Sequence, residues 1–194
     1  MTPCQESPSF PSSNRGAQSL AVATPERVSA RRSFGGILGL IALVALIGIA
    51  PTTQAQTTVF SENFSDDSGS STSTLTGDQW VATETTSGAS GTMSITSGAF
   101  RFSGSSANTT YTCTWQSDPI TIAGYTGITI TSSSAGSGGT SAPSLSMSNG
   151  TLSNGSFTPN SGATTTVITY SFSVAKNKYR TLDNVVLSGT LTCT

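Results

Sequence analysis

The sequence contains no histidine among its 194 residues, and charged residues make up only 9% of it. Without histidine the chain cannot form the Ser-His or Cys-His pairs of nucleophilic enzymes, nor metal sites with imidazole ligands. Its three cysteines are too few for a four-thiolate metal centre. These absences exclude most hydrolase and metalloenzyme classes and leave carboxylate pairs as the remaining catalytic option.

Clusters of basic residues are missing from the part of the chain after residue 55. That part holds seven acidic and four basic residues, a net charge of −3. Nucleic-acid-binding proteins carry clustered Lys and Arg, so this class of partner is excluded. Ser, Thr, Gly and Asn dominate instead, a composition typical of extracellular bacterial β proteins, in which hydroxyl groups take the place of charges on solvent-facing surfaces.

The one long apolar run, "ILGLIALVALIGIA" at 37–50, follows an arginine-containing stretch and is closed by Pro51. This order is typical of a secretory signal peptide, with small residues placed for a cut before Gln56. The alternative is a membrane anchor, but the run has 14 residues, whereas a membrane-spanning helix needs about 20. We therefore expect cleavage and export.

The chain divides into three expected parts. Residues 1–33 form a disordered extension with the positively charged signal region, residues 34–55 form the apolar signal region and cleavage site, and residues 56–194 form a single domain. Removing 55 of 194 residues leaves 139, enough for one core. The expected location is secreted, extracellular or on the cell surface, with the periplasm as the alternative, and no membrane contact after cleavage.

The exported part shows the period of β-strands. In "TYTCTWQS", Tyr111, Cys113 and Trp115 point one way while the threonines between them point the other, the pattern of a half-buried strand. About nine such segments recur, separated by Gly, Asn and Ser turns that include two Asn-Gly pairs, and no amphipathic helix follows residue 56. The sequence predicts an all-β antiparallel β-sandwich, specifically a jelly roll.

The exported part holds two cysteines, Cys113 and Cys193. An even cysteine count in an exported chain favours a disulfide, and the parity of both residues allows both thiols to point inward. A bridge would close a loop of about 80 residues and stabilise the fold by about 4 kcal/mol. The alternative is two buried free cysteines that act as small apolar groups.

Asp183 stands in the apolar terminal segment "TLDNVVL", where a buried carboxylate is costly unless a partner neutralises it. Calcium prefers carboxylate and amide oxygens, and "FSENFSDD" near the start of the domain offers Glu62. The first and last strands of such sandwiches often lie side by side, which would bring the carboxylates of Glu62 and Asp183 together. The alternative is that Asp183 begins a turn or is solvated, with Glu62 on an exposed face.

The segments "FSENFSD", "CTWQSDPITIAGYTGITIT" and "YRTLDNVVLSGT" together resemble the jelly-roll modules of secreted multidomain proteins from Bacteroidetes-like bacteria. Those modules are similar to carbohydrate-binding and lectin-like β-sandwich domains. The resemblance covers most of residues 58–190. It implies a structural calcium that joins an acidic residue of the first strand to an aspartate of the last, here Glu62 and Asp183.

Sugar binding requires an aromatic ring to stack on and polar groups to fix hydroxyls. Trp80, after the polar "LTGDQ", and Tyr125, in the "AGYTG" turn, are the aromatic residues we expect to be exposed. The sequence therefore predicts a noncatalytic carbohydrate-binding jelly roll whose partner is an extracellular glycan or surface protein. The oligomeric state is not determined by the sequence.

Two alternative functions remain open. One is a structural or adhesive cell-surface module that makes protein contacts and has no sugar site. The other is a small glycoside hydrolase with two catalytic carboxylates, for which no motif selects among Glu62, Glu84, Asp118 and Asp183. An exposed aromatic cluster would favour sugar binding. An unpaired edge strand would favour protein contact, and two carboxylates converging in a cleft would favour catalysis.

Overall fold

The computed structural model describes residues 54–86, 90–107, 109–138 and 140–192. These residues form strands and no helix, and every strand pairing among them is antiparallel. None of the described residues belongs to a helix with the length and hydropathy needed to cross a membrane. The predicted all-β antiparallel fold is confirmed, whereas the predicted extension and apolar signal region lie in residues 1–53, outside the described residues.

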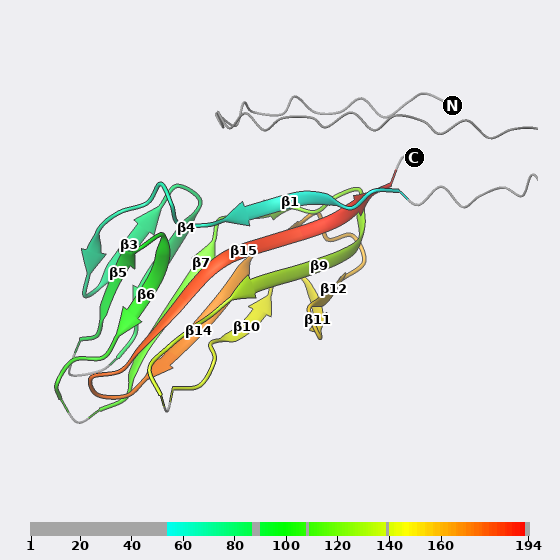
Figure 1. The fold of residues 1–194 in the computed structure, drawn as a ribbon. Helices are drawn as coiled ribbons and strands as arrows, with labels where there is room; N and C mark the ends of the chain where they lie inside the picture. Colours follow the sequence, from blue (N-terminus) through cyan, green and yellow to red (C-terminus); the bar gives the residue numbers. More distant parts are fainter. Residues whose placement is uncertain (1–53, 87–89, 108, 139, 193–194) are drawn as a thin grey trace, which may run out of the picture. The chain divides into compact units, whose positions relative to one another are not determined.

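The larger sheet has eight strands and forms one layer (Figure 1). Its order is β11 (Gly150–Ser153), β12 (Ser156–Pro159), β9 (Tyr125–Ser133), β15 (Tyr179–Leu191), β6 (Ala99–Ser103), β5 (Thr92–Thr96) and β2 (Ser70–Ser71). β1 (Thr57–Glu62) also pairs with β15, so the first and last strands lie side by side as predicted.

The second layer is a five-stranded sheet in the order β10 (Ser144–Met147), β14 (Ile168–Val174), β7 (Tyr111–Ser117), β4 (Trp80–Glu84) and β3 (Thr74–Gly77). β8 (Ile120–Thr121) and β13 (Thr165–Thr166) form a separate two-stranded sheet. The buried apolar side chains form one cluster drawn from both large sheets, which is the arrangement of a β-sandwich.

Aromatic residues dominate the centre of this core. Phe64, Trp80, Phe100 and Trp115 are at most 2% exposed, and their ring centroids lie 5.6 to 6.3 Å apart in five pairs. Trp115 also packs on Tyr170 at 5.9 Å. Pairs of this geometry contribute about 0.5–1.5 kcal/mol each beyond their buried area, so the cluster is a major source of stability.

Most strands follow the predicted alternation, but a few lie where the sequence pattern is weak. The strands β2 and β3 were not predicted, because their segment "SSTSTLTG" offers only Leu75 as an apolar residue. The second Asn-Gly pair forms the β11–β12 hairpin, with positive φ at Asn154 and Gly155 as a type I′ turn requires. The first pair instead carries the chain from β10 in one sheet to β11 in the other.

Candidate functional site

A polar cleft of about 220 Å³ lies where β1 ends. Ser61, Glu62, Asn63, Asp66, Asp67, Asp78 and Gln79 line it. Phe64 fixes the chain here, because its ring is fully buried in the aromatic cluster while its backbone has φ of 55°. Such a conformation is strained for a bulky residue and persists only where the surroundings impose it. Burial of Phe64 thus holds Glu62 and the following acidic residues around the cleft.

Trp80 follows the cleft residue Gln79 and is only 2% exposed. Its indole N–H donates a hydrogen bond of 2.8 Å to Asp67 Oδ2. A Cβ at Gly77 would come within 2.1 Å of the indole nitrogen, so the glycine makes room for the ring. The prediction that Trp80 is an exposed ring for sugar stacking is wrong, because the indole packs in the core and Asp67 satisfies its polar atom.

The carboxyl group of Glu62 is partly withdrawn from water. Glu62 pairs with Val185 and has the parity of the buried Phe60, so it faces the core side of the sheet. Burial raises the pKa of Glu62 above its usual value of 4.5, and the charges of Asp67 and Asp66 add to the rise. A hydrogen bond of 2.6 Å from the Phe64 amide to Oε1 opposes it.

Asp183 has a local role at an irregularity of β15. Its two carboxylate oxygens accept hydrogen bonds from the backbone amide and side-chain amide of Asn184, at 2.7 and 2.9 Å. Asn184 has φ of 51°, and the register with β9 shifts between Asp183 and Val186, which is a β-bulge. Both Leu182 and Val185 therefore point into the core, and the carboxylate stabilises the bulge.

The structure brings β1 and β15 together but gives Glu62 and Asp183 different partners. The acidic residues that act on the Glu62 charge are Asp67 and Asp66. Within the described ranges, no group of three His, Cys, Asp or Glu residues is arranged to hold a metal ion. The oxygen ligands of the cleft suit calcium in kind. Calcium at Glu62 and Asp183 stays a prediction.

Tyr125, the second predicted stacking residue, is half-buried at the start of β9. Its Cβ and Cδ1 would lie 3.3 Å from a Cβ built at Gly189, so one side of the residue packs on β15. In the part of the chain that the structure describes, Leu191 is the one large apolar side chain that is exposed. That part therefore offers no exposed aromatic cluster.

Cys113 is buried and carries no disulfide among the described residues, while Cys193 lies outside them. Cross-strand pairing places Cys113 opposite Phe172 in β14. The Phe172 ring packs on Phe100 of β6, and Phe100 lies opposite Leu182 of β15. Leu191 lies nine residues further along β15, about 30 Å at the rise of a strand. The structure therefore gives no support to the predicted bridge to Cys193.

We predict that Cys113 is a free thiol that reacts only after unfolding. Burial raises the pKa of its thiol to about 12, with the Glu84 charge adding to the rise, so the reactive thiolate is nearly absent at neutral pH. A thiol-alkylating reagent followed by peptide mass spectrometry should label Cys113 in denaturant without reductant, but not in native protein. If Cys113 were labelled only after a reductant is added, the result would support the predicted disulfide instead.

The outer face of the five-stranded sheet carries an ordered array of hydroxyl groups. Cross-strand pairing places Ser144, Ser171, Thr114, Thr83 and Thr74 in one row across all five strands. A second row holds Ser146, Thr169, Gln116, Val81 and Thr76. We call these two rows the hydroxyl face. No charged residue stands in either row.

The hydroxyl face owes its regularity to uninterrupted pairing. The four ladders of this sheet show no register shift, whereas both β1 and β9 shift against β15 in the other sheet. None of the five hydroxyls of the first row makes a side-chain hydrogen bond within the described part of the chain, and all five residues are exposed or half-buried. They are free to bind water or a ligand.

The sequence contained the signal for this face, but not its two-dimensional order. Alternating threonines in "TYTCTWQS" predicted a solvent-facing side of one strand. The row exists only because five strands pair in matching register, which depends on contacts between distant segments.

Comparisons with known proteins found no family model, no curated protein and no solved structure that matches the chain.

Proposed function

We propose that the chain is a noncatalytic, exported jelly-roll module that binds neutral carbohydrate polymers through the hydroxyl face. The observation that carries the proposal is the row of five unpaired hydroxyls, Ser144, Ser171, Thr114, Thr83 and Thr74. Each hydroxyl can both donate and accept a hydrogen bond. Sugar hydroxyls have the same capacity, so the two surfaces are complementary without any charge.

The spacing of the row suits an extended polymer. Neighbouring strands lie about 4.8 Å apart, similar to the advance of one sugar along an extended polysaccharide. A polymer lying across the strands would therefore meet about one side-chain hydroxyl per sugar. Because no aromatic ring stacks on the sugars, each contact is weak, and we expect binding to strengthen with polymer length as more sites engage.

The cleft at Glu62 is the observation that favours a hydrolase instead. It combines a carboxyl group of raised pKa with further carboxylates, a pattern found in acid–base pairs. However, its volume of about 220 Å³ is below the roughly 300–1,000 Å³ of ordinary ligand pockets. Asp67 is also held by Trp80. We therefore assign the cleft a structural role.

The proposed function is tested by cosedimentation with insoluble neutral polysaccharides such as cellulose and chitin. The test variant is Thr83→Val/Thr114→Val/Ser171→Ala, which removes three hydroxyls of the first row and keeps strand-forming residues. The matched control, Thr58→Val/Thr131→Val/Ser188→Ala, removes three hydroxyls of the other sheet that likewise make no side-chain hydrogen bond among the described residues. At about 0.5–1.5 kcal/mol for each hydrogen bond, the test variant should bind at least about tenfold more weakly.

In this experiment the control should bind as the wild type does. Binding that both variants retain would show a carbohydrate module with a different site. Absence of binding by the wild type to any neutral polysaccharide would reject the proposed function and favour a surface module that makes protein contacts. The unpaired edge of β1, which pairs only with β15 in the described chain, would then be the surface to examine.

Structural calcium bound by Glu62 and Asp183 remains part of the proposal, and Glu62→Gln tests the contribution of Glu62. Because the folded-state pKa is raised, the protonated form of Glu62 is favoured in the folded protein, and this stability is lost as pH rises from about 4.5 through the raised pKa. In chelator, Glu62→Gln should therefore melt at a higher temperature than the wild type at neutral pH, with the difference vanishing in acid.

Added calcium should reverse this order at neutral pH. A bound cation would neutralise the crowded carboxylates and raise the melting temperature of the wild type, but not that of Glu62→Gln. Thermal melts with calcium and with chelator measure both effects. An equal response of the two proteins to calcium would show that Glu62 is not a ligand.

A further inference from the structure

A second pocket, of about 350 Å³, lies at the connection between β12 and β13. We call it the turn pocket, and it is lined by Asn149, Asn160, Ser161, Gly162, Ala163, Thr164 and Thr165. Six of these residues form the continuous segment 160–165, and Asn149 follows β10. The volume lies within the range of roughly 300–1,000 Å³ that is usual for small-molecule sites. The turn pocket is therefore large enough for a small ligand.

Backbone contacts hold the wall formed by the β12–β13 connection. The Ala163 amide donates a hydrogen bond of 3.0 Å to the carbonyl of Asn160, which closes a β-turn. Gly162 has φ of 80°, the left-handed conformation that position i+2 of a type II turn requires. The carbonyl of Thr164 accepts a hydrogen bond of 2.9 Å from the Ile122 amide. The connection therefore has a defined conformation before any ligand binds.

Asn149 joins this connection to the end of β10. Its carbonyl accepts a hydrogen bond of 2.8 Å from the Asn160 amide, and its side-chain Nδ2 donates one of 3.0 Å to the Thr165 carbonyl. These two bonds tie the two parts of the lining together. A preformed site loses less conformational freedom when a ligand binds, so polar contacts that are weak one by one can suffice for binding.

The polar side chains of the turn pocket are available to a ligand. Within the described part of the chain, no hydrogen bond engages the side chains of Asn160, Ser161, Thr164 or Thr165. The first three of these residues are exposed, and Thr165 is half-buried. Serine and threonine hydroxyls both donate and accept hydrogen bonds, and an asparagine amide offers two donors and one acceptor oxygen. The lining thus presents mixed donors and acceptors at one place.

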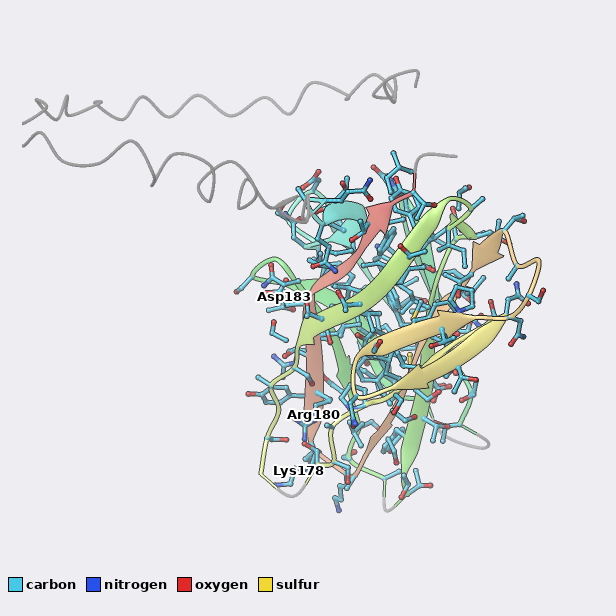
Figure 2. All side chains as sticks on the ribbon, turned by 90° about the vertical axis from the view of Figure 1, so that its right-hand side faces the viewer. Lys178, Arg180 and Asp183 are labelled. Carbon is cyan, nitrogen blue, oxygen red and sulfur yellow. The ribbon has the colours of Figure 1, made fainter. Side chains whose placement is uncertain are left out.

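The lining limits the chemistry of the ligand. None of the described residues that line the pocket is charged, so an ion would lose its hydration there without a counter-charge. None of them is aromatic or has a long aliphatic side chain, so an apolar ligand would find no apolar wall. β14, of seven residues, separates this connection from the turn that holds Lys178 (Figure 2). A neutral ligand that carries several hydroxyl groups is the class that remains.

The turn pocket and the hydroxyl face are separate sites. Thr166 and Ile168 are buried, so the alternating residues Thr165 and Thr169 share the other side of the chain. Four residues of extended chain separate these two threonines, a span of about 13 Å. The rows of the hydroxyl face run across the strands, whereas the pocket is displaced along them. A polymer bound on a row would therefore not enter the pocket.

We propose that the turn pocket binds the terminal sugar unit of a neutral glycan. The hydroxyls and amides of the lining replace water around the hydroxyls of one sugar. Because the lining comes from one short connection and Asn149, the pocket accommodates a single unit, and the end of a glycan is where a single unit is accessible. Each hydrogen bond is exchanged for one with water and contributes little net, so the binding is weak and depends on several contacts together.

A nuclear magnetic resonance titration of the protein expressed from Met1 tests this proposal, with the methyl glycosides of glucose, galactose, mannose and N-acetylglucosamine as probes. A methyl glycoside has its anomeric oxygen linked, as the terminal unit of a glycan has. The backbone amide signals of Asn149 and of residues 160–165 should shift together with one saturation curve. The test variant, Asn160→Ala/Thr164→Val, removes two polar side chains and keeps Gly162 in its turn. Its affinity should be at least about tenfold lower.

The matched control, Thr151→Val/Thr158→Val, removes two exposed hydroxyls from the preceding β11–β12 hairpin and should bind as the wild type does. Absence of shifts at residues 160–165 with every glycoside would overturn the proposal, and so would equal affinities of the test variant and the wild type. Binding of the free reducing sugars but not of their methyl glycosides would also overturn it, because the ligand would then be a free sugar and not the end of a glycan.

This inference goes beyond the proposed function, because it involves no residue of the hydroxyl face. The variant of that face, Thr83→Val/Thr114→Val/Ser171→Ala, should keep its affinity for the methyl glycosides. Shifts at the hydroxyl face alone would overturn the site in the turn pocket and leave the proposed function intact. A wild type that fails to cosediment with polysaccharides but shows the shifts at residues 160–165 would do the reverse.

Discussion

Replacing Trp80 with alanine should lower the free energy of unfolding by about 3–5 kcal/mol, the usual cost of deleting a large buried aromatic side chain. The indole is 2% exposed and packs against Phe64, Phe100 and Trp115, at centroid distances of 5.6, 5.8 and 6.1 Å. Chemical denaturation measures the loss. If Trp80 were instead a sugar platform, the variant would keep its stability and lose polysaccharide binding.

Trp80→Phe separates packing from hydrogen bonding at the same position. Phenylalanine keeps a ring against Phe64 but removes the N–H group that donates to Asp67. A hydrogen bond to a charged acceptor contributes about 1.5–3 kcal/mol, so this variant should be destabilised less than the alanine variant. Equal losses for the two variants would show that the bond to Asp67, rather than ring packing, holds the indole.

Gly104→Ala should destabilise the fold by about 1–3 kcal/mol, the typical cost of adding atoms to a well-packed site. A Cβ at Gly104 would lie 2.4 Å from the carbonyl oxygen of Ala175 and 2.7 Å from Cδ2 of Tyr111. The carbonyl is fixed, since it accepts a hydrogen bond from Lys178 in the β14–β15 turn. The strand β6 and the β14–β15 turn would therefore have to move apart.

Gly138→Ala is the matched control for this substitution, because no atom lies within 4 Å of a Cβ built there. Its denaturation midpoint should stay close to that of the wild type. A Gly104→Ala variant as stable as this control would mean that the β6 end and the β14–β15 turn are not in the contact described here.

The alternation of apolar residues predicted the sheet architecture well where each strand carries several of them. Tyr111, Cys113 and Trp115 are all buried, as their spacing indicated. The pairing of β1 with β15 was also predicted. β3 was not predicted, because Leu75 is its only buried residue. This strand forms through backbone pairing with β4 and not through an alternating pattern of its own.

Site residues were harder to predict, because their roles depend on partners distant in the sequence. Trp80 follows polar residues, a pattern that predicts exposure. Its ring is nevertheless buried, because it packs on Phe64 and its N–H group donates a hydrogen bond to Asp67. The calcium role of Asp183 stays a prediction, and the sequence pattern did not indicate its hydrogen bonds to Asn184 at a bulge of β15. The hydroxyl face depends on the register of five strands, and no single segment encodes that register.

The most direct test of carbohydrate binding is a nuclear magnetic resonance titration of the protein with a soluble neutral oligosaccharide, a method suited to weak binding. The account predicts that the backbone amide signals of Thr83, Thr114 and Ser171 shift together with one saturation curve. Those of Thr129 and Ser188, on the outer face of the other sheet, should stay in place. Shifts confined to Glu62 and its cleft, or to the other sheet, would contradict the assignment of the hydroxyl face.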